Sequence, residues 1–325
     1  MTAQTVFASP GQVLSAGDRW ASFLKIFAGE VLGAFERMTK TMDKHIIRTI
    51  SNGKSASFPV MGRATAKYLV PGANLDDQRA KIEHNEKIIP IDGLLTSDVF
   101  ITDIEEAMNH YDVRTEYSRQ MGEALALAAD AAVLAEASNL VLATANVPDG
   151  AGKPKGTGVG GRYVTGVSAQ TAAFGQKIIE GLMSARATMT KNYVPGSERY
   201  FFCTPEVYTA ILLALLPNVA NYPALIDIET GNIKNVAGFE VIEVPHLLDG
   251  GVDGKHAFDA KFTAAKITGV AMHRSAVGTV KLRDLAMEQA RRAEYQSDQI
   301  IGKYAMGHGG LRPESVAVFT EIAIV

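Results

Sequence analysis

This sequence contains little cysteine and tryptophan, and its net charge is small. Its 325 residues contain one cysteine, Cys203, and one tryptophan, Trp20, and the formal net charge is −3. A single cysteine excludes an intrachain disulfide, and the apolar run 200–203 around it predicts a buried thiol. The small net charge argues against a global electrostatic attraction to nucleic acid or to an anionic membrane surface.

The sequence also lacks the common catalytic, cofactor-binding and metal-binding motifs. It has no His-Glu-x-x-His, no Gly-x-Ser-x-Gly and no paired-cysteine spacing. Glycines 156, 158 and 161 match a dinucleotide fingerprint in their letters, but Lys-Pro-Lys at 153–155 stands where an apolar strand is required. Gly-Lys-Ser at 53–55 is similar to a P-loop, but Arg48 occupies the place of the first glycine.

Other groups that could do chemistry are isolated. Asp76–Asp77 and Glu105–Glu106 are sequence neighbours, so their side chains diverge and are typical of surface charge. His308-Gly309-Gly310 resembles part of an oxyanion-hole motif, without a nucleophile motif elsewhere. The histidines are scattered, each more typical of a structural position than of a catalytic one: His45, His84, His110, His246, His256, His273 and His308. We therefore expect no enzymatic activity, no cofactor and no metal.

The start of the chain and its single cysteine predict a protein that folds in a reducing cytoplasm, or in something assembled there. No charged segment followed by an apolar run opens the chain, which predicts that there is no secretory signal. Hydrophobic residues make up 47% of the chain and charged residues 21%, which is ordinary for a protein with a sizeable core. Residues 1–54 hold 7 Lys/Arg and 4 Asp/Glu, a net charge of +3, so the other residues sum to −6. This basic segment could pair with a neighbouring subunit or could be a solvated face.

A long alanine-rich helix at 111–142 is the element around which we expect the chain to be organised. The stretch contains no proline and one glycine, Gly122, and Asp112 is a good N-cap residue. Between Ala124 and Ala135 the only charge is Asp130, which predicts a helix wrapped by protein on most sides. It has no run of about 18 apolar residues, so we do not expect a membrane span. A core helix of an ordinary α/β enzyme is the alternative.

Residues 53–92 predict a long two-stranded arm. The segments 54–60 and 80–91 are extended, and Pro71-Gly72 marks a turn between them. The arm has few large apolar residues and many charges of both signs, and an isolated hairpin of that kind is marginal in water. Its stability must therefore come from the body of the chain or from other subunits. Before it, residues 19–35 place apolar side chains at helical spacing, in an element that we expect to lie outside the later core.

The remaining chain predicts alternating helices and strands. We expect helices at 170–191 and from Thr204-Pro205 to just before Pro217, and a short helix that opens with a capping box at 102–105. Strands are predicted at 199–203, 239–244, 257–270, 279–282 and 316–324, whereas 286–304 fits either type. Six glycines in the fourteen residues 148–161 predict a flexible loop.

Seven sequence blocks carry a resemblance to a known family. They are 53–60 (GKSASFPV), 68–72 (YLVPG), 91–99 (IDGLLTSDV), 103–114 (DIEEAMNHYDVR), 190–195 (TKNYVP), 236–246 (VAGFEVIEVPH) and 304–314 (YAMGHGGLRPE). Each block is a weak signal singly, but together and in this order they are specific. The chain resembles the major capsid proteins of tailed bacteriophages, most of all those of the T-seven-like short-tailed phages of the autographivirus group.

The resemblance implies an α+β fold of the HK-ninety-seven-like type. Residues 1–52 would be an N-terminal arm, 53–92 the extended E-loop, and 93–168 with 275–325 a peripheral domain that contains the spine helix 112–142. Residues 169–274 would form the axial domain. Some family members cross-link through a lysine and an asparagine; Lys67 lies in the arm, and we predict that it does not react.

On this interpretation, contacts between subunits come from two groups of residues. Apolar burial would supply strength and charged pairs would set register, because exposed ion pairs contribute only about 0–1 kcal/mol each. The apolar candidates are Trp20, Phe23, Phe27 and Phe35. The charged candidates are Arg63, Lys67, Asp76, Asp77, Arg79, Lys81, Glu83 and Glu86.

The resemblance implies a structural function in the virion capsid. Copies of the chain would assemble as pentamers and hexamers into an icosahedral shell around the double-stranded DNA genome, in the host bacterial cytoplasm. Partners would be a scaffolding protein and a portal, with weak and nonspecific DNA contact and no membrane. The alternatives are an encapsulin-like compartment shell, or an α/β oxidoreductase that uses the glycines of 156–161.

Overall fold

The computed structural model describes residues 31, 34–35, 38–61, 66–72, 74, 76, 84–102, 104, 113–143, 157–160, 171–216, 226–227, 231–233 and 235–322. These residues fall into two compact units. Unit 1 draws on Met1–Met38, Leu95–Ala126 and Leu285–Tyr304, and unit 2 on Thr39–Leu94, Leu127–Asp284 and Ala305–Val325. Helices and sheets occur together, which confirms the α+β class expected from the sequence.

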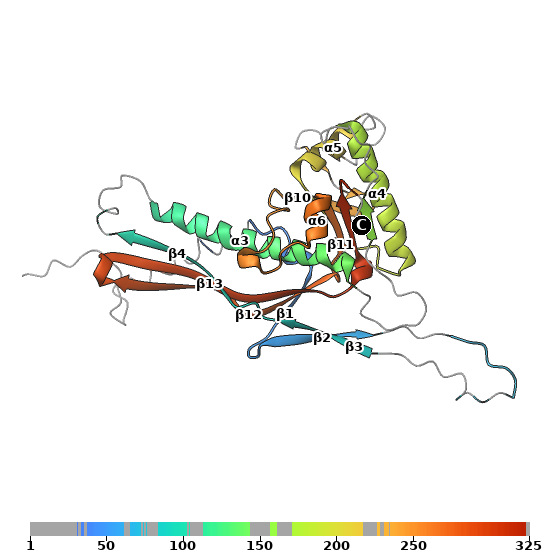
Figure 1. The fold of residues 1–325 in the computed structure, drawn as a ribbon, viewed down its shortest axis with the longest axis horizontal. Helices are drawn as coiled ribbons and strands as arrows, with labels where there is room; N and C mark the ends of the chain where they lie inside the picture. The colour runs from blue at the N-terminus through green and yellow to red at the C-terminus, as the bar shows by residue number, and fades with distance from the viewer. Residues whose placement is uncertain are drawn as a thin grey trace, which may run out of the picture. The chain divides into compact units, whose positions relative to one another are not determined.

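A six-stranded sheet is the centre of unit 2 (Figure 1). In order across the sheet the strands are β5 (Thr157–Gly160), β14 (Val316–Thr320), β11 (Ile267–His273), β6 (Arg199–Cys203), β10 (Phe239–Glu243) and β9 (Asn235–Val236). Strand β6 pairs in parallel with β10 and antiparallel with β11, so the sheet is mixed. Strands β5 and β14 lie in this sheet although they fall outside 169–274, and the predicted domain boundaries remain a prediction.

The two faces of this sheet belong to two separate cores. Side chains alternate between the faces of a strand, and β6 follows this rule. Phe201 and Cys203 lie on the first face and enter the first core, whereas Tyr200 and Phe202 lie on the second face and enter the second core. Strand β14 divides in the same way, with Phe319 on the first side. Strands that are buried on both faces have almost no polar positions, which is why 199–203 could be recognised as a buried strand.

Helices α4 (Ala172–Lys191) and α5 (Pro205–Leu215) cover the first face (Figure 1). Thr171 caps α4, because its hydroxyl oxygen accepts a hydrogen bond from the Phe174 amide at 3.3 Å. The predicted apolar stripe of α4 is confirmed as buried: Phe174, Ile178, Leu182, Ala185 and Met189. Helix α5 begins with a proline at its first position, as expected.

Gly175 allows α4 and α5 to approach each other closely. A Cβ atom at this position would lie 2.0 Å from the Ala210 carbonyl oxygen and 2.9 Å from the Ala214 Cβ atom. Both contacts are far shorter than van der Waals distances. The glycine is therefore required by packing between helices, although it is a poor helix former.

We predict that Gly175→Ala destabilises the fold. Alanine favours an isolated helix by about 1 kcal/mol over glycine, but the added methyl group must push α5 away, and overpacking costs about 1–3 kcal/mol. Because the clash is with backbone atoms, we expect a cost at the upper end of that range and a net loss of roughly 2 kcal/mol in urea unfolding. Gly196→Ala is the matched control, because no atom lies within 4 Å of a Cβ built there. Equal stability of the two variants would contradict the prediction.

The predicted long helix is present as α3 (Val113–Asn139), which continues as the 3-10 turn η3 (Leu140–Leu142). Residues 129–135 are buried on all sides, which confirms that this part of the helix is wrapped by protein. Its last turns pack on the second face of the six-stranded sheet through Val133, Leu134 and Leu140. Asp112 lies outside the described residues.

Helix α3 also has the length and composition of a membrane-spanning helix. The most apolar 18-residue window of the stretch Glu116–Leu142 has a mean hydropathy of 1.6, and 67% of that window is buried inside the protein. The mean is high because alanine and leucine dominate, even though charged residues interrupt the stretch. Burial of this kind is typical of the core helix of a folded protein.

Long strands dominate the rest of the fold. A second sheet has the order β1 (Ile46–Thr49), β12 (Val277–Arg292), β13 (Ser297–Gly310) and β4 (Leu94–Thr102). Strands β12 and β13 resolve the ambiguity at 286–304 as strand, interrupted by the 3-10 turn η6 (Ala293–Tyr295). Further short elements are η1 (Met42–Lys44), β7 (Ile226–Asp227), β8 (Asn232–Ile233), η5 (Val252–Gly254) and η7 (Pro313–Ser315).

Unit 1 has its own small core. Val31, Ile101, Met121 and Ile300 are buried together. Gly122 lets the N-terminal helical segment approach α3, because a Cβ atom there would lie 2.6 Å from the Val31 carbonyl oxygen. The prediction that residues 19–35 lie outside the core is therefore wrong for the described part, 31 and 34–35, which is buried.

Two other expectations are wrong. Residues 257–270 do not form one strand: helix α6 (Ala260–Ala265) precedes β11, and the Asp259 carboxylate caps it by accepting from the Lys261 amide at 2.9 Å. The glycine-rich stretch 148–161 is not a loop throughout, since 157–160 form β5 and pair with β14. Glycine weakens a strand locally, but backbone pairing with β14 compensates for it.

Cys203 lies in the interior of the sheet, as the sequence predicted. Its side chain is fully buried in the first core. Burial, and secondarily the negative charge of Glu243, raises the pKa of the thiol far above its ordinary value. The thiol therefore stays protonated and behaves as a small apolar side chain.

Candidate functional site

The predicted arm exists as an antiparallel pair of strands. Strand β2 (Ser55–Met61) pairs with β3 (His84–Pro90), with Ser55 opposite Pro90 and Met61 opposite His84 (Figure 1). The two strands form a sheet of their own. A two-stranded hairpin needs further packing to be stable. The contacts at the base of the arm, where β2 begins and β3 ends, therefore determine whether the arm keeps a fixed orientation relative to the body of its subunit.

The base of the arm packs on the body of its own chain. Ala56 and Ile89 are buried with Val280 and Leu311. Next to them the Arg48 guanidinium donates a hydrogen bond to the Ser57 carbonyl oxygen at 2.5 Å and lies 5.9 Å from the Phe58 ring centroid. The arm is thus anchored at one end by apolar contacts of unit 2.

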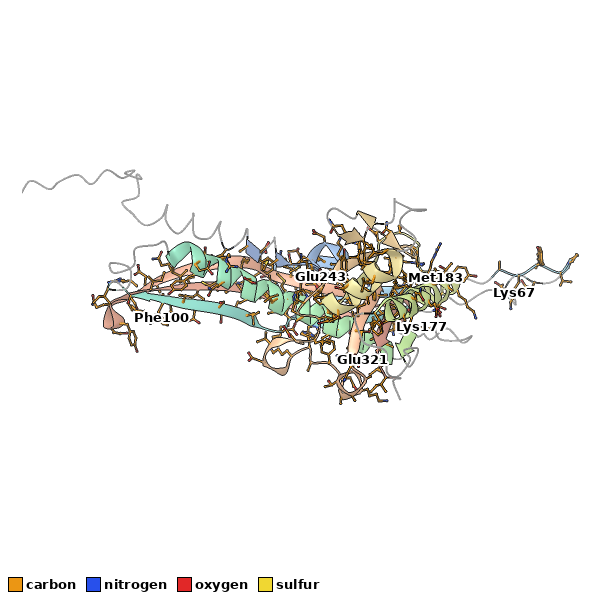
Figure 2. All side chains as sticks on the ribbon, turned by 90° about the horizontal axis from the view of Figure 1, so that it is seen from above. Lys67, Phe100, Lys177, Met183, Glu243 and Glu321 are labelled. Carbon is orange, nitrogen blue, oxygen red and sulfur yellow. The ribbon has the colours of Figure 1, made fainter. Side chains whose placement is uncertain are left out.

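The far end of the arm exposes consecutive apolar side chains. Tyr68 is 100% exposed, Val70 62% and Leu69 50%. Gly72 has a φ of +87°, as a turn at Pro71-Gly72 requires, and no atom lies within 4 Å of a Cβ built there. Figure 2 shows Lys67 on this extended segment. Apolar side chains without cover of their own are typical of a surface that meets another molecule.

The structure describes some of the predicted contact residues and not others. Lys67, Asp76 and Glu86 are exposed on the arm. Phe35 is buried, and its ring lies 6.1 Å from that of Tyr304 in an edge-on arrangement, so its own chain already covers it. The other candidates lie outside the described residues: Trp20, Phe23, Phe27, Arg63, Asp77, Arg79, Lys81 and Glu83.

A buried carboxylate joins the N-terminal segment to α3. Asp130 is fully buried and accepts hydrogen bonds from the Lys40 amide at 2.6 Å, the Thr41 amide at 3.2 Å and the Thr41 hydroxyl at 2.6 Å. His246 Nε2 lies 3.5 Å from Asp130 Oδ2, too poorly aligned for a hydrogen bond. Three donors around one carboxylate satisfy a charge that would otherwise be costly to bury.

A chain of hydrogen bonds continues from Thr41 through two neutral histidines. His45 Nδ1 faces the Thr41 carbonyl oxygen at 2.7 Å, so it carries the proton and donates. His45 Nε2 lies 2.7 Å from Thr279 Oγ1, and Thr279 Oγ1 lies 2.9 Å from His308 Nδ1. With both rings neutral, the Thr279 hydroxyl donates to His45 and accepts from His308.

Burial keeps these two histidines neutral. It lowers the pKa of His45, and it lowers the pKa of His308 to about 3, with smaller contributions from the nearby histidines. A lowered folded-state pKa stabilises the fold above the ordinary value of 6.5, and this contribution is lost as the pH falls below it. The network therefore weakens in acid.

His256 is the opposite case. Its Nε2 lies 2.7 Å from Asp92 Oδ2 and its Nδ1 lies 2.8 Å from Glu136 Oε1. Burial lowers the pKa of His256, but hydrogen bonds and charge from the two carboxylates outweigh burial and raise the pKa to about 9. His256 is thus a cation at neutral pH, and its ring lies 5.5 Å from that of His308.

Sequence reasoning missed this network because its members are far apart in the chain. His45, His256 and His308 make hydrogen bonds within the fold, but nothing in their spacing connects positions 45, 256 and 308. The only local signal was the set of glycines beside His308, whose partial resemblance to an oxyanion-hole motif lacks an accompanying nucleophile motif. They serve packing instead, since a Cβ atom at Gly307 would lie 2.0 Å from the Pro90 carbonyl oxygen and one at Gly309 would lie 2.9 Å from Ile89.

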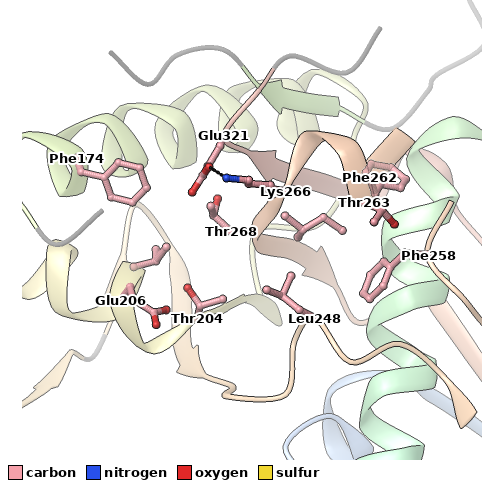
Figure 3. A pocket seen from close by; sticks show the side chains of 12 residues that line it. Phe174, Thr204, Glu206, Leu248, Phe258, Phe262, Thr263, Lys266, Thr268 and Glu321 are labelled. Carbon is pink, nitrogen blue, oxygen red and sulfur yellow. Dashed lines mark ion pairs between the residues drawn. The ribbon is translucent and has the colours of Figure 1, made fainter. Parts of the chain in front are cut away.

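A pocket of about 400 Å³ lies beside α5 and α6 (Figure 3). Its walls are mainly apolar and include Phe258, Phe262 and Leu248. At one side Lys266 Nζ lies 3.4 Å from Glu321 Oε2. Its described lining contains no histidine or cysteine, and no group of three or more potential metal ligands occurs among the residues that the structure describes.

Sequence comparisons identify relatives over most of the chain. Residues 57–319 match the family described as Gp10A-like, major capsid protein. The chain is 55% identical to the major capsid protein of Enterobacteria phage T3 over 334 residues, which covers 96% of this chain and 95% of that protein. It is also 55% identical to the major capsid protein of Escherichia phage T7 over 319 residues, covering 93% and 92%.

Solved structures agree with this result. The capsid structure of cyanophage P-SCSP1u is similar with a TM-score of 0.73 at 30% identity, over 98% of this chain and 94% of that one. The mature capsid of bacteriophage PhiM1 is similar with a TM-score of 0.68 at 18% identity, over 87% of each chain, a likeness of fold alone. The expected HK-ninety-seven-like fold is confirmed, and the comparisons do not support the compartment-shell or oxidoreductase alternatives.

Proposed function

Because this chain belongs to the Gp10A-like family of phage major capsid proteins, we propose that its copies are joined into pentamers and hexamers through the arm at 53–92. The chain is a structural protein of the virion capsid. The observation that supports this proposal is the exposed apolar tip of the arm. Tyr68, Leu69 and Val70 present apolar surface that their own chain leaves uncovered, and a neighbouring subunit would cover it.

The division of the arm into a packed base and an exposed tip suits this function. Ala56 and Ile89 hold the base on its own subunit, so the strands would enter a neighbour's surface in a defined direction. The charged residues Lys67, Asp76 and Glu86 remain exposed and would set register more than strength. Many modest contacts in a closed shell act together, since each subunit is held by several neighbours.

Assembly would take place in the host cytoplasm with a scaffolding protein and a portal as partners. The shell would enclose the double-stranded DNA genome, and contact with that DNA would be weak and nonspecific. Residues outside 1–54 sum to a charge of −6, and an acidic surface gains little from phosphate neutralisation. We propose no enzymatic step, cofactor or metal for this function, and no lysine cross-link at Lys67.

Co-expression with the scaffolding protein of a related phage tests the proposed assembly. We expect closed shells of uniform diameter by negative-stain microscopy, and far fewer regular particles when the scaffolding protein is omitted. The same preparation should show no binding of a nicotinamide cofactor above background. Small soluble oligomers under all conditions would contradict the proposal.

A further inference from the structure

The arm enters the body of the protein at a cluster of charged groups. Asp92 follows the last residue of β3 by two positions, so its place determines where the arm begins. Its amide donates to the Met306 carbonyl oxygen at 3.2 Å, and the Ile91 amide donates to the Lys54 carbonyl oxygen at 2.9 Å. The first of these bonds ties the base of the arm to β13, and the second joins its two chain segments.

The Asp92 side chain extends this attachment to other segments. Its Oδ2 atom accepts from His256 Nε2 at 2.7 Å and from the His308 amide at 3.3 Å. His256 in turn reaches Glu136 on α3 at 2.8 Å. Asp92, His256 and Glu136, which we call the arm anchor, thus connect the arm base to α3 and β13.

The geometry requires a cation in the middle of the anchor. A carboxylate can only accept hydrogen bonds, and each ring nitrogen of His256 faces one. Both nitrogens must therefore carry protons to satisfy the two contacts. A neutral imidazole has one N–H, so it would leave one carboxylate facing a lone pair at hydrogen-bond distance, which is repulsive.

Other charged and titratable groups surround the anchor. The Lys255 ammonium donates to the Asp92 carbonyl oxygen, which places a second cation beside the arm base. His308 lies on the other side and is neutral, linked through Thr279 to His45. A charged His256 thus balances two carboxylates, whereas a charged His308 would oppose it.

We propose that the arm anchor is a protonation-dependent positioning device, in which the His256 imidazolium holds the base of the arm in the direction that assembly uses. This proposal rests on the proposed function of the arm, because its direction matters only if the arm joins neighbouring subunits. His256 acts through Asp92 and not by touching a neighbouring subunit. When His256 loses its proton, one of its two hydrogen bonds is lost, and the arm base loses its link to α3. The Asp92 amide still bonds to Met306 on β13, so the base is loosened on the α3 side only.

The direction of the pH effect follows from the raised pKa. A cation that is stabilised in the closed state contributes fully below its ordinary pKa of 6.5. The contribution declines as the pH rises and is gone above about 9. The arm base should therefore be closed at pH 6.5 and open at pH 9.5, the opposite of the acid-side weakening expected from His45 and His308.

Amide hydrogen exchange on the unassembled protein tests the proposal. We expect the protection factor of residues 88–94, which is corrected for the intrinsic pH dependence of exchange, to fall at least tenfold between pH 6.5 and pH 9.5. Protection of 199–203 in the buried strand β6 should stay constant over the same range. A constant protection factor at 88–94 would overturn the proposal without the need for any variant.

Two variants refine this test. His256→Gln should reduce the protection of 88–94 at least tenfold at pH 6.5 and abolish its pH dependence, and Glu136→Gln should weaken both. His273→Gln is the matched control, because His273 bonds with Ser275 at 2.8 Å away from the arm. Unchanged exchange in His256→Gln would overturn the proposal. The result does not depend on shell formation, so it is separate from the test of the arm in assembly.

Discussion

Asp130→Asn is expected to destabilise unit 2 by about 3 kcal/mol, a larger loss than that expected for Gly175→Ala. An asparagine has the same shape but offers one acceptor oxygen, and its amide nitrogen would face an N–H or O–H donor. The Lys40 and Thr41 amides and the Thr41 hydroxyl all point at this carboxylate. At least one buried donor would lose its partner.

Urea unfolding of the unassembled protein measures this effect. Glu240→Gln is the matched control, since Glu240 is also a carboxylate that contacts the 40–44 segment, through the Lys44 ammonium at 3.2 Å, but its side chain is about half exposed. An exposed pair of this kind contributes about 0–1 kcal/mol, so the control should unfold almost as the parent does. If Asp130→Asn costs no more than Glu240→Gln, the carboxylate does not hold the N-terminal segment as described.

Replacement of residues 64–78 by a short Gly-Ser turn is expected to leave the protomer folded and to abolish closed shells. The described tip residues are exposed, so their removal should change the free energy of unfolding little. In the shell, burial of Tyr68, Leu69 and Val70 would contribute roughly 5 kcal/mol per subunit, at about 1.5–3 kcal/mol for each large apolar side chain. Loss of that contribution at every subunit should prevent closure.

Finer variants separate the apolar contribution from the charged one. Tyr68→Ser, Leu69→Ser and Val70→Ser together should reduce the yield of closed shells at least tenfold in negative-stain counts. Lys67→Gln, in the same segment, should lower the yield by less than twofold, because exposed ion pairs contribute little. Normal shells from the protein with the shortened arm would show that the arm does not join subunits.

The sequence alone determined the features that depend on local pattern. Helix α4 was predicted from its apolar repeat of 3.6, because a buried face imposes that repeat on neighbouring residues. Helices α3 and α5 were predicted from composition and helix-start residues, strand β6 from a continuous apolar run, and strand β10 from the glycine that introduces it. The arm was predicted from the opposite signal, a long extended stretch with too few apolar residues to be stable alone. Blocks of residues in a specific order along the chain also indicated the family.

Only the tertiary structure decided what depends on distant segments. Residues 257–270 have strand-like composition, yet α6 forms because Asp259 caps it and Phe262 enters the second core. Gly175 is explained by the backbone of Ala210, which no pattern in α4 reveals. The arm anchor joins positions 92, 136 and 256, so neither the charge of His256 nor the neutrality of His308 can be known until folding brings their partners within hydrogen-bond distance.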